Sequence, residues 1–204
     1  MSKNIFSGAV LVLGTCALLA FAAGASGVQN SNAKTDDHMG HGAGAMTADS
    51  KFAMTAAMGG MMEVELGRLA AQKGATDEVR QFGQRMVDDH SKANEELMRV
   101  ASSKGMTLPT ALDAKHQAEM QKFSALSGES FDREYVKMMV KDHKKDVSEF
   151  QKEAERGTDP DIKAFAASTL PTLREHLQMI QRINDKMALR KSGNLKTMNG
   201  NSNQ

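Results

Sequence analysis

Met86-Val87-Asp88-Asp89-His90-Ser91-Lys92 returns later in the chain as Met139-Val140-Lys141-Asp142-His143-Lys144-Lys145, so that the pattern Met-Val-x-Asp-His-x-Lys occurs twice. The similarity continues at the same offset on both sides of the pattern. The further pairs are Arg80 with Arg133, Phe82 with Tyr135, Glu96 with Glu149, Leu97 with Phe150 and Ala101 with Ala154. Apolar residues in both stretches follow the 3.6-residue period of an amphipathic helix. The sequence therefore predicts two helices that carry the same face, with a histidine on that face.

The same periodicity predicts four long helices, bounded by capping residues and glycines. Their expected ranges are about 49–73, from 76 or 77 to near 105, from near 129 to 157, and from Asp159-Pro160 to about 187, with a shorter helix over about 111–126. No stretch alternates as a strand does. We therefore expect an all-α fold, a ferritin-like up-and-down four-helix bundle with a short crossover helix between helices 2 and 3. A simple four-helix bundle is the alternative.

The first 25 residues have the features of an export signal. Lys3 precedes an uncharged apolar run over 9–23, and Ala23-Gly24-Ala25 forms a cleavage site of the A-x-A type. The run is short for a membrane-spanning helix, although a signal retained as an anchor is the alternative. We therefore expect a periplasmic or cell-envelope-associated protein.

The remainder of the chain divides into three parts. Residues 26–47 and 191–204 are rich in small and polar residues without periodicity, which predicts a disordered linker and a disordered tail. Residues 48–190 form the helical bundle domain. The only cysteine, Cys16, lies in the signal, so the mature chain is expected to have no disulfide and no thiolate chemistry.

The charge of the chain limits the classes of partner. The chain has 26 basic and 25 acidic residues, and the signal removes one lysine and no acid, so the mature domain is balanced. A balanced charge argues against binding to nucleic acid. No apolar stretch after the signal is long enough to span a membrane. A homo-oligomer remains possible, and the sequence does not identify a protein partner.

Helical-wheel arithmetic places both histidines of the repeat on a core face. Relative to Met86, His90 falls at about 40°, within the apolar arc, and Asp89 falls at about −60°, beside it. The second copy repeats this arrangement for His143 and Asp142. Each histidine is therefore expected to enter the core, with an aspartate at its shoulder.

The other two long helices also place one polar residue on the apolar face, namely Glu63 and His176. Three imidazoles and one carboxylate suit Zn²⁺, Cu²⁺ or Fe²⁺. The predicted metal ligands are Glu63, His90, His143 and His176, with Asp89 and Asp142 orienting the imidazoles. No catalytic residue and no organic cofactor are predicted. The alternative is a structural cluster in which buried acids satisfy the histidines.

Di-iron bundles use Glu-x-x-His on two helices, and this spacing is absent here. The residues three positions before the core histidines are Val87, Val140 and Leu173. The sequence therefore argues against a di-iron oxidase of the usual kind.

Four runs of sequence resemble an exported bacterial family of unknown function, whose members are often labelled outer membrane proteins. The runs are 56–70, 85–90, 126–135 and 169–177, and the resemblance covers about 51–187. The resemblance implies a ferritin-like fold and a periplasmic or envelope location. It implies no established activity.

Two functions therefore stay open. The first is a non-enzymatic exported bundle that binds a transition metal in its core. The second is an envelope stress or interaction module in which the histidines are structural or respond to pH. A metal-dependent oxidase is a third, more distant alternative.

Overall fold

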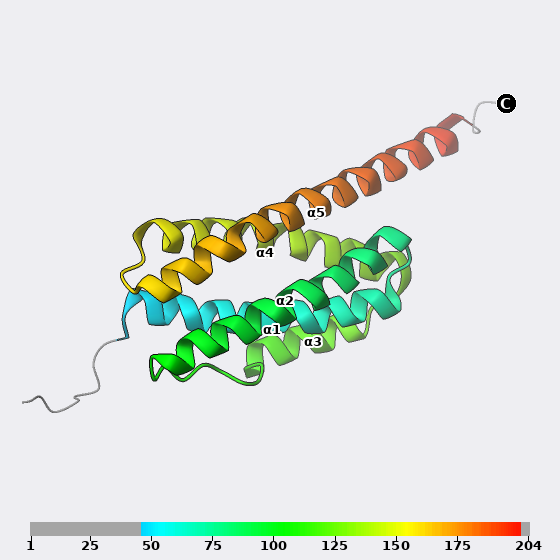
Figure 1. The fold of residues 1–204 in the computed structure, drawn as a ribbon. Coiled ribbons are helices and arrows are strands. Elements are labelled where there is room, and N and C mark those ends of the chain that lie inside the picture. Colours follow the sequence, from blue (N-terminus) through cyan, green and yellow to red (C-terminus); the bar gives the residue numbers. More distant parts are fainter. Residues whose placement is uncertain (1–45, 201–204) are drawn as a thin grey trace, which may run out of the picture. The chain divides into compact units, whose positions relative to one another are not determined.

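The computed structural model describes residues 46–200, with side chains as far as Lys191. Its helices are α1 (Ala48–Lys73), α2 (Asp77–Ser103), α3 (Ala114–Ser124), α4 (Gly128–Arg156) and α5 (Pro160–Gly200) (Figure 1). The predicted all-α bundle is confirmed, with four long helices and the short α3 between the second and the third. The predicted signal, and the linker apart from its last two residues, lie outside the described part of the chain.

The bundle consists of two helical hairpins, α1–α2 and α4–α5, each closed by a short turn (Figure 1). α1 packs along α2 and α4 along α5, while α2 also contacts α5 and α1 contacts α4. The short α3 lies against α1 and α4. The helices α2 and α4, which carry the repeated motif, are therefore diagonal neighbours, and their core faces point toward the same centre.

α1 and α2 meet backbone to backbone at Gly67 and Gly83. A Cβ atom on Gly83 would lie 2.6 Å from the Ala70 Cβ and 2.7 Å from the Gly67 carbonyl oxygen. A Cβ atom on Gly67 would lie 2.6 Å from the Gly83 carbonyl oxygen. Since neither position has room for a side chain, this crossing fixes how far α1 is shifted along α2.

Each hairpin turn is capped by an aspartate from the other hairpin. Asp132 in α4 accepts hydrogen bonds from the backbone N–H groups of Ala75 and Thr76, immediately before α2, at 2.9 and 3.1 Å. Asp49 in α1 accepts the corresponding bonds from the turn before α5. These caps satisfy N–H groups that a helix start leaves free, and they tie the two hairpins together.

The swapped caps reveal an internal two-fold repetition. Asp132 follows Asp49 by 83 residues, and the same spacing separates Gly74 from Gly157, which end α1 and α4. α1 thus corresponds to α4, and α2 corresponds to α5.

The cap at Asp49 includes a second buried carboxyl group, that of Glu153 in α4. Burial, together with the adjacent Asp49 carboxylate, raises the pKa of Glu153 from its ordinary 4.5 to about 7. The protonated form is favoured in the folded state. Its contribution to stability is therefore fully present below pH 4.5 and is lost as the pH rises through 7.

We expect the wild-type protein to lose about 1–3 kcal/mol of unfolding free energy, relative to Glu153→Gln, between about pH 5 and pH 8. Glutamine does not ionise and can still donate to Asp49, so the comparison isolates the titration of Glu153. Urea denaturation of both proteins at the two pH values measures the difference. The same pH dependence in both proteins would contradict this account.

α5 continues as a helix through Gly200, beyond residue 190, where the sequence analysis ends the bundle domain. No proline interrupts residues 191–200. Among the described helices, none is both long enough and apolar enough to cross a membrane.

Candidate metal centre

Three histidine rings meet in the centre of the bundle: His90 from α2, His143 from α4 and His176 from α5. Their ring centroids are separated by 5.7 Å (His90–His143), 5.3 Å (His90–His176) and 5.4 Å (His143–His176). One possible ligand atom of each ring lies within 4.8 Å of those of the other two. All three side chains are buried. A helical wheel predicts which way a side chain points from its helix, but not its position along the bundle axis. The structure places the three rings at the same level along the bundle.

His143 and His176 each form a hydrogen bond to an oxygen atom through one ring nitrogen. Nδ1 of His143 donates to the Met139 carbonyl oxygen at 3.0 Å. Nε2 of His176 donates to Oδ2 of Asp89 at 2.8 Å. Carbonyl and carboxylate oxygens accept hydrogen bonds, so these contacts place each ring proton on the held nitrogen.

His90 is held in the same way by Glu63, since its Nδ1 lies 3.0 Å from Oε2 of that residue. Each of the three rings is therefore oriented by a neighbour through one nitrogen. The remaining nitrogens have no hydrogen-bond partner: Nε2 of His90, Nε2 of His143 and Nδ1 of His176.

Unpartnered buried nitrogens are unusual, because buried polar atoms are normally satisfied. Here three such nitrogens belong to three rings that meet in the centre of the bundle, and each offers a lone pair when its ring is neutral. Metal-binding histidines typically donate their other ring N–H to a carboxylate or a backbone carbonyl. The three rings have this arrangement, so the chemistry of the cluster suits a metal ion.

Glu63 in α1 is the fourth buried polar group, with 5% of its surface exposed. While Oε2 faces His90, Oε1 lies 3.6 Å from Nδ1 of His143 and has no hydrogen-bond partner. The same carboxylate can therefore orient His90 and offer its second oxygen to a metal.

The electrostatics of the cluster keep two of the three rings neutral. Burial lowers the pKa of His143 and lowers the pKa of His176 to about 4. Burial also opposes a charge on His90, but the Glu63 carboxylate outweighs it and raises the pKa of that ring. Burial alone would raise the pKa of Glu63, but the neighbouring histidines outweigh burial and lower this pKa to about 2. Neutral imidazole and ionised carboxylate are the forms that bind metal.

The two aspartates of the repeat lie in different environments. Asp89 reaches across to His176 in α5 instead of holding the adjacent His90, and it also accepts from Nε of Arg85 at 3.1 Å. Asp142 is half-buried and makes no hydrogen bond to any of these three rings. Burial raises the pKa of Asp142 to about 6.

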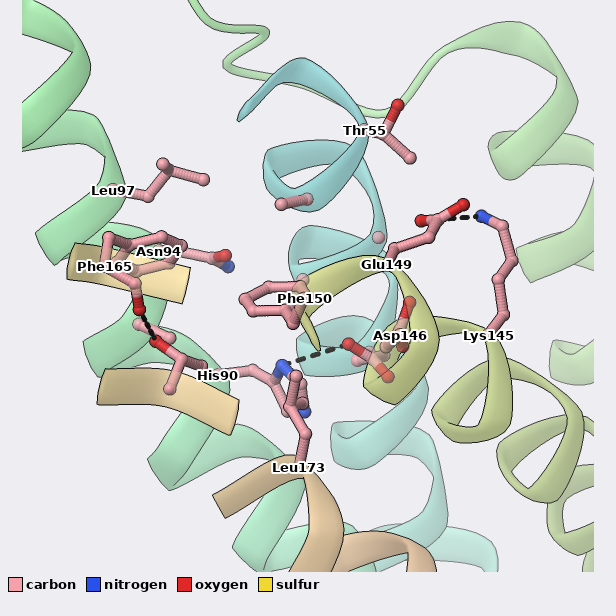
Figure 2. A pocket seen from close by; sticks show the side chains of 16 residues that line it. Thr55, His90, Asn94, Leu97, Lys145, Asp146, Glu149, Phe150, Phe165 and Leu173 are labelled. Carbon is pink, nitrogen blue, oxygen red and sulfur yellow. Dashed lines mark hydrogen bonds and ion pairs between the residues drawn. The ribbon is translucent and has the colours of Figure 1, made fainter. Parts of the chain in front are cut away.

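A cavity of about 50 Å³ reaches the cluster from the side of the bundle (Figure 2). The polar residues that matter most for its chemistry are Glu63, His90, Asn94, Lys145, Asp146 and Glu149. Such a volume is enough for an ion together with a water molecule.

Asp146 is a cavity-lining acid beside the three-histidine group that was not predicted from the sequence. Together with Glu63 and His143 it forms a second group whose ligand atoms lie within 4.8 Å of one another. Burial, and then the charge of Glu63, raise the pKa of Asp146 to about 9. It follows Met139 by two helical turns, at about −20° on the wheel, so the core-face criterion applied to acids would have found it. It is also the counterpart of Glu63 in the internal repetition, 83 residues later.

The sequence profile of the Domain of unknown function (DUF4142) matches residues 34–183 of this chain. The chain belongs to the DUF4142 family. The resemblance to an uncharacterised family is thereby confirmed, and all four predicted ligands lie within the matched segment.

Two solved structures resemble this DUF4142 protein. A DUF305 fragment from Deinococcus radiodurans has a TM-score of 0.60 at 13% identity, covering 69% of this chain and 98% of that one. A DUF305 protein from Streptomyces coelicolor, described as secreted, has a TM-score of 0.57 at 17% identity, with coverage of 69% and 93%. At these identities the similarity shows the fold alone. No curated protein matches the chain.

Proposed function

We propose that this protein is an exported helical bundle that binds one divalent transition-metal ion through His90, His143, His176 and Glu63. The observation that carries the proposal is the meeting of three buried histidines, one ligand atom of each lying within 4.8 Å of those of the other two. Each ring also has one nitrogen oriented by an oxygen atom and one nitrogen without a partner. The ligand set fits Zn²⁺, Cu²⁺ or Fe²⁺. The protein acts by holding the metal, without a catalytic residue.

The distances suit a metal after a modest contraction. Metal–nitrogen bonds of about 2.0–2.1 Å in a tetrahedral site separate the ligand atoms by about 3.4 Å. The ligand atoms of the three histidines lie within 4.8 Å of one another, so small rotations of the rings bring them to this separation. Glu63 completes four-coordination with Oε1 while Oε2 keeps its contact with His90.

Two observations support export to the periplasm or cell envelope. Residues 1–25 have the composition of a cleavable signal. A protein with the same fold, the Streptomyces coelicolor DUF305 protein, is described as secreted.

Elemental analysis of the purified mature protein tests the metal proposal. After incubation with Zn²⁺, Cu²⁺ or Fe²⁺ and desalting, the wild-type protein is expected to retain one ion per chain. The double variant His90→Ala/His143→Ala is expected to retain almost none, with circular dichroism confirming its helical fold. Equal and near-zero metal in both proteins would overturn the proposal.

Asp89→Asn is expected to weaken metal binding by about 10–100-fold. The carboxylate accepts the Nε2 proton of His176 and so keeps Nδ1 free for the metal. Competition with a chromophoric chelator measures the affinity. Asp88→Asn is the matched control, because Asp88 is exposed and bonds only to Gln84. An unchanged affinity in Asp89→Asn would show that Asp89 does not orient a ligand.

A second candidate function rests on the buried pair of Glu63 and His90, whose pKa values move apart so as to favour an ion pair. In this alternative the cluster remains free of metal and stabilises an envelope interaction module. Its stability contribution is present below the ordinary histidine pKa of 6.5 and is lost as the pH rises through the raised pKa of His90. A metal-free protein with a melting temperature that is independent of pH would contradict it.

A further inference from the structure

The cavity connects the surface with the metal centre along one side of α4. Lys145 and Glu149 form an ion pair at 3.5 Å with side chains 58% and 41% exposed, so they lie at the mouth. Asp146 lies between them in the sequence and is half-buried, while Glu63 and His90 are buried at the inner end. Figure 2 shows Asp146 on the same helix as Lys145 and Glu149, whose side chains pair with each other. Carboxyl groups thus occur at the mouth, in the middle and at the inner end, and an arriving cation would displace the proton of the middle one, Asp146.

The inner end of this cavity contains an unsatisfied acceptor. Oε1 of Glu63 is buried, has no hydrogen-bond partner, and belongs to a side chain that lines the cavity. Asp146 comes from α4 and Glu63 from α1, and the ligand atoms of Glu63, Asp146 and His143 lie within 4.8 Å of one another. This group is distinct from the three-histidine group, although it shares His143.

We propose that Glu63 and Asp146, beside His143, form a second cation position at the inner end of the cavity, through which the metal passes on its way to the histidines. This inference rests on the proposed function. The expected ligand is a divalent metal ion that still carries water, because carboxylate oxygens hold such ions while imidazoles suit their final, less hydrated state. Glu63 is common to both positions, so one of its two oxygens can stay bound to the ion while the ion moves from the cavity to the three histidines.

The part of the cavity wall that α1 forms carries two glycines, which leave the path to the histidines free of side chains. Gly59 and Gly60 both line the cavity, and a Cβ atom on Gly59 would meet nothing within 4 Å. A Cβ atom on Gly60 would lie 2.1 Å from Oδ1 of Asn94, which covers that glycine. A large side chain at Gly59 therefore has space to enter the cavity and block it, without disturbing the packing of α1 on α2.

Stopped-flow absorption with Co²⁺ tests the route, because Co²⁺ gains a visible spectrum on entering a site of nitrogen and oxygen ligands. Asp146→Asn and Gly59→Leu are expected to slow uptake at least tenfold, while the equilibrium affinity stays within about threefold of wild type. Since these variants change the route and not the final site, release of Co²⁺ into excess EDTA must slow by the same factor. Asp88→Asn, at an exposed aspartate outside the cavity, is the matched control for the aspartate-to-asparagine change. Gly59→Ala controls for the substitution of glycine.

The outcomes separate the two proposals. Wild-type rates of uptake in Asp146→Asn, in a protein that binds Co²⁺, would overturn the route and leave the metal site intact. A wild-type protein that binds no Co²⁺, Zn²⁺, Cu²⁺ or Fe²⁺ would overturn both. Circular dichroism shows whether Gly59→Leu folds, and Asp146→Asn, which is nearly isosteric, tests the route if it does not.

Discussion

Zn²⁺ or Co²⁺ at a free concentration 100 times the dissociation constant is expected to raise the unfolding free energy of the wild-type protein by about 2.7 kcal/mol. The reason is that the four ligands come from four different helices, so the site exists only in the folded chain. Binding to the native state alone shifts the unfolding equilibrium by mass action. Urea denaturation with metal, and with EDTA in its place, measures the gain.

His143→Ala is expected to abolish most of this gain. Removing a fully buried ring also destabilises the metal-free protein, because it leaves a cavity in the core. The quantity to compare is therefore the difference between the metal-loaded and metal-free unfolding free energies of the same variant. That difference is expected to fall to near zero in His143→Ala.

His116→Ala is the matched control for this experiment. His116 lies in α3, where it pairs with Asp113 at 2.7 Å at the start of the helix, away from the three-histidine group. Its removal should leave the gain from metal unchanged. A full gain in His143→Ala, or a lost gain in His116→Ala, would place the bound metal outside the bundle core.

The fold could be predicted because its determinants are local. The 3.6-residue period, the proline at the start of α5 and the glycines Gly74 and Gly157 each act within one or two helical turns. The inward direction of Glu63 and His143 could be predicted for the same reason, since the angle of a side chain around its helix depends on sequence position alone.

The depth of each residue along the bundle could not be predicted, because it depends on how neighbouring helices are shifted along one another. The Gly67–Gly83 contact and the swapped caps of Asp49 and Asp132 fix these shifts, and all of them join segments distant in sequence. For the same reason the partner of Asp89 could not be read from its neighbour His90.

The sequence repeat and the structural repetition are different relationships. The Met-Val-x-Asp-His-x-Lys motif relates α2 to α4, whereas the caps relate α1 to α4 and α2 to α5. Two diagonal helices carry the motif because each must present a histidine to the same central point. The Met-Val-x-Asp-His-x-Lys motif therefore reflects the similar positions of its two histidines in the core, and it does not mark the two hairpins as copies of each other.

Gly83→Ala is expected to destabilise the protein by about 1–3 kcal/mol, even though alanine is the better helix former. The added Cβ atom would lie 2.6 Å from the Ala70 Cβ, 2.7 Å from the Gly67 carbonyl oxygen and 2.8 Å from the Ala71 nitrogen. Two of these atoms belong to the backbone of α1 and cannot turn away, so the two helices must separate along part of their contact.

Gly59→Ala in the same helix pair is the control, and it is expected to stabilise the protein by about 0.5–1 kcal/mol. Its Cβ atom meets nothing within 4 Å, so only the gain in helix propensity remains. Urea denaturation of both variants with EDTA present measures the two effects. An equal gain in stability from both substitutions would show that α1 and α2 do not cross at Gly67 and Gly83.

The same substitution links the helix crossing to the metal centre. Glu63 in α1 and His90 in α2 face each other at 3.0 Å only while the two helices keep their present spacing. Gly83→Ala is therefore expected to weaken metal binding as well as stability, whereas Gly59→Ala leaves the equilibrium affinity unchanged. Loss of stability in Gly83→Ala with full metal affinity would mean that Glu63 is not needed to hold the metal.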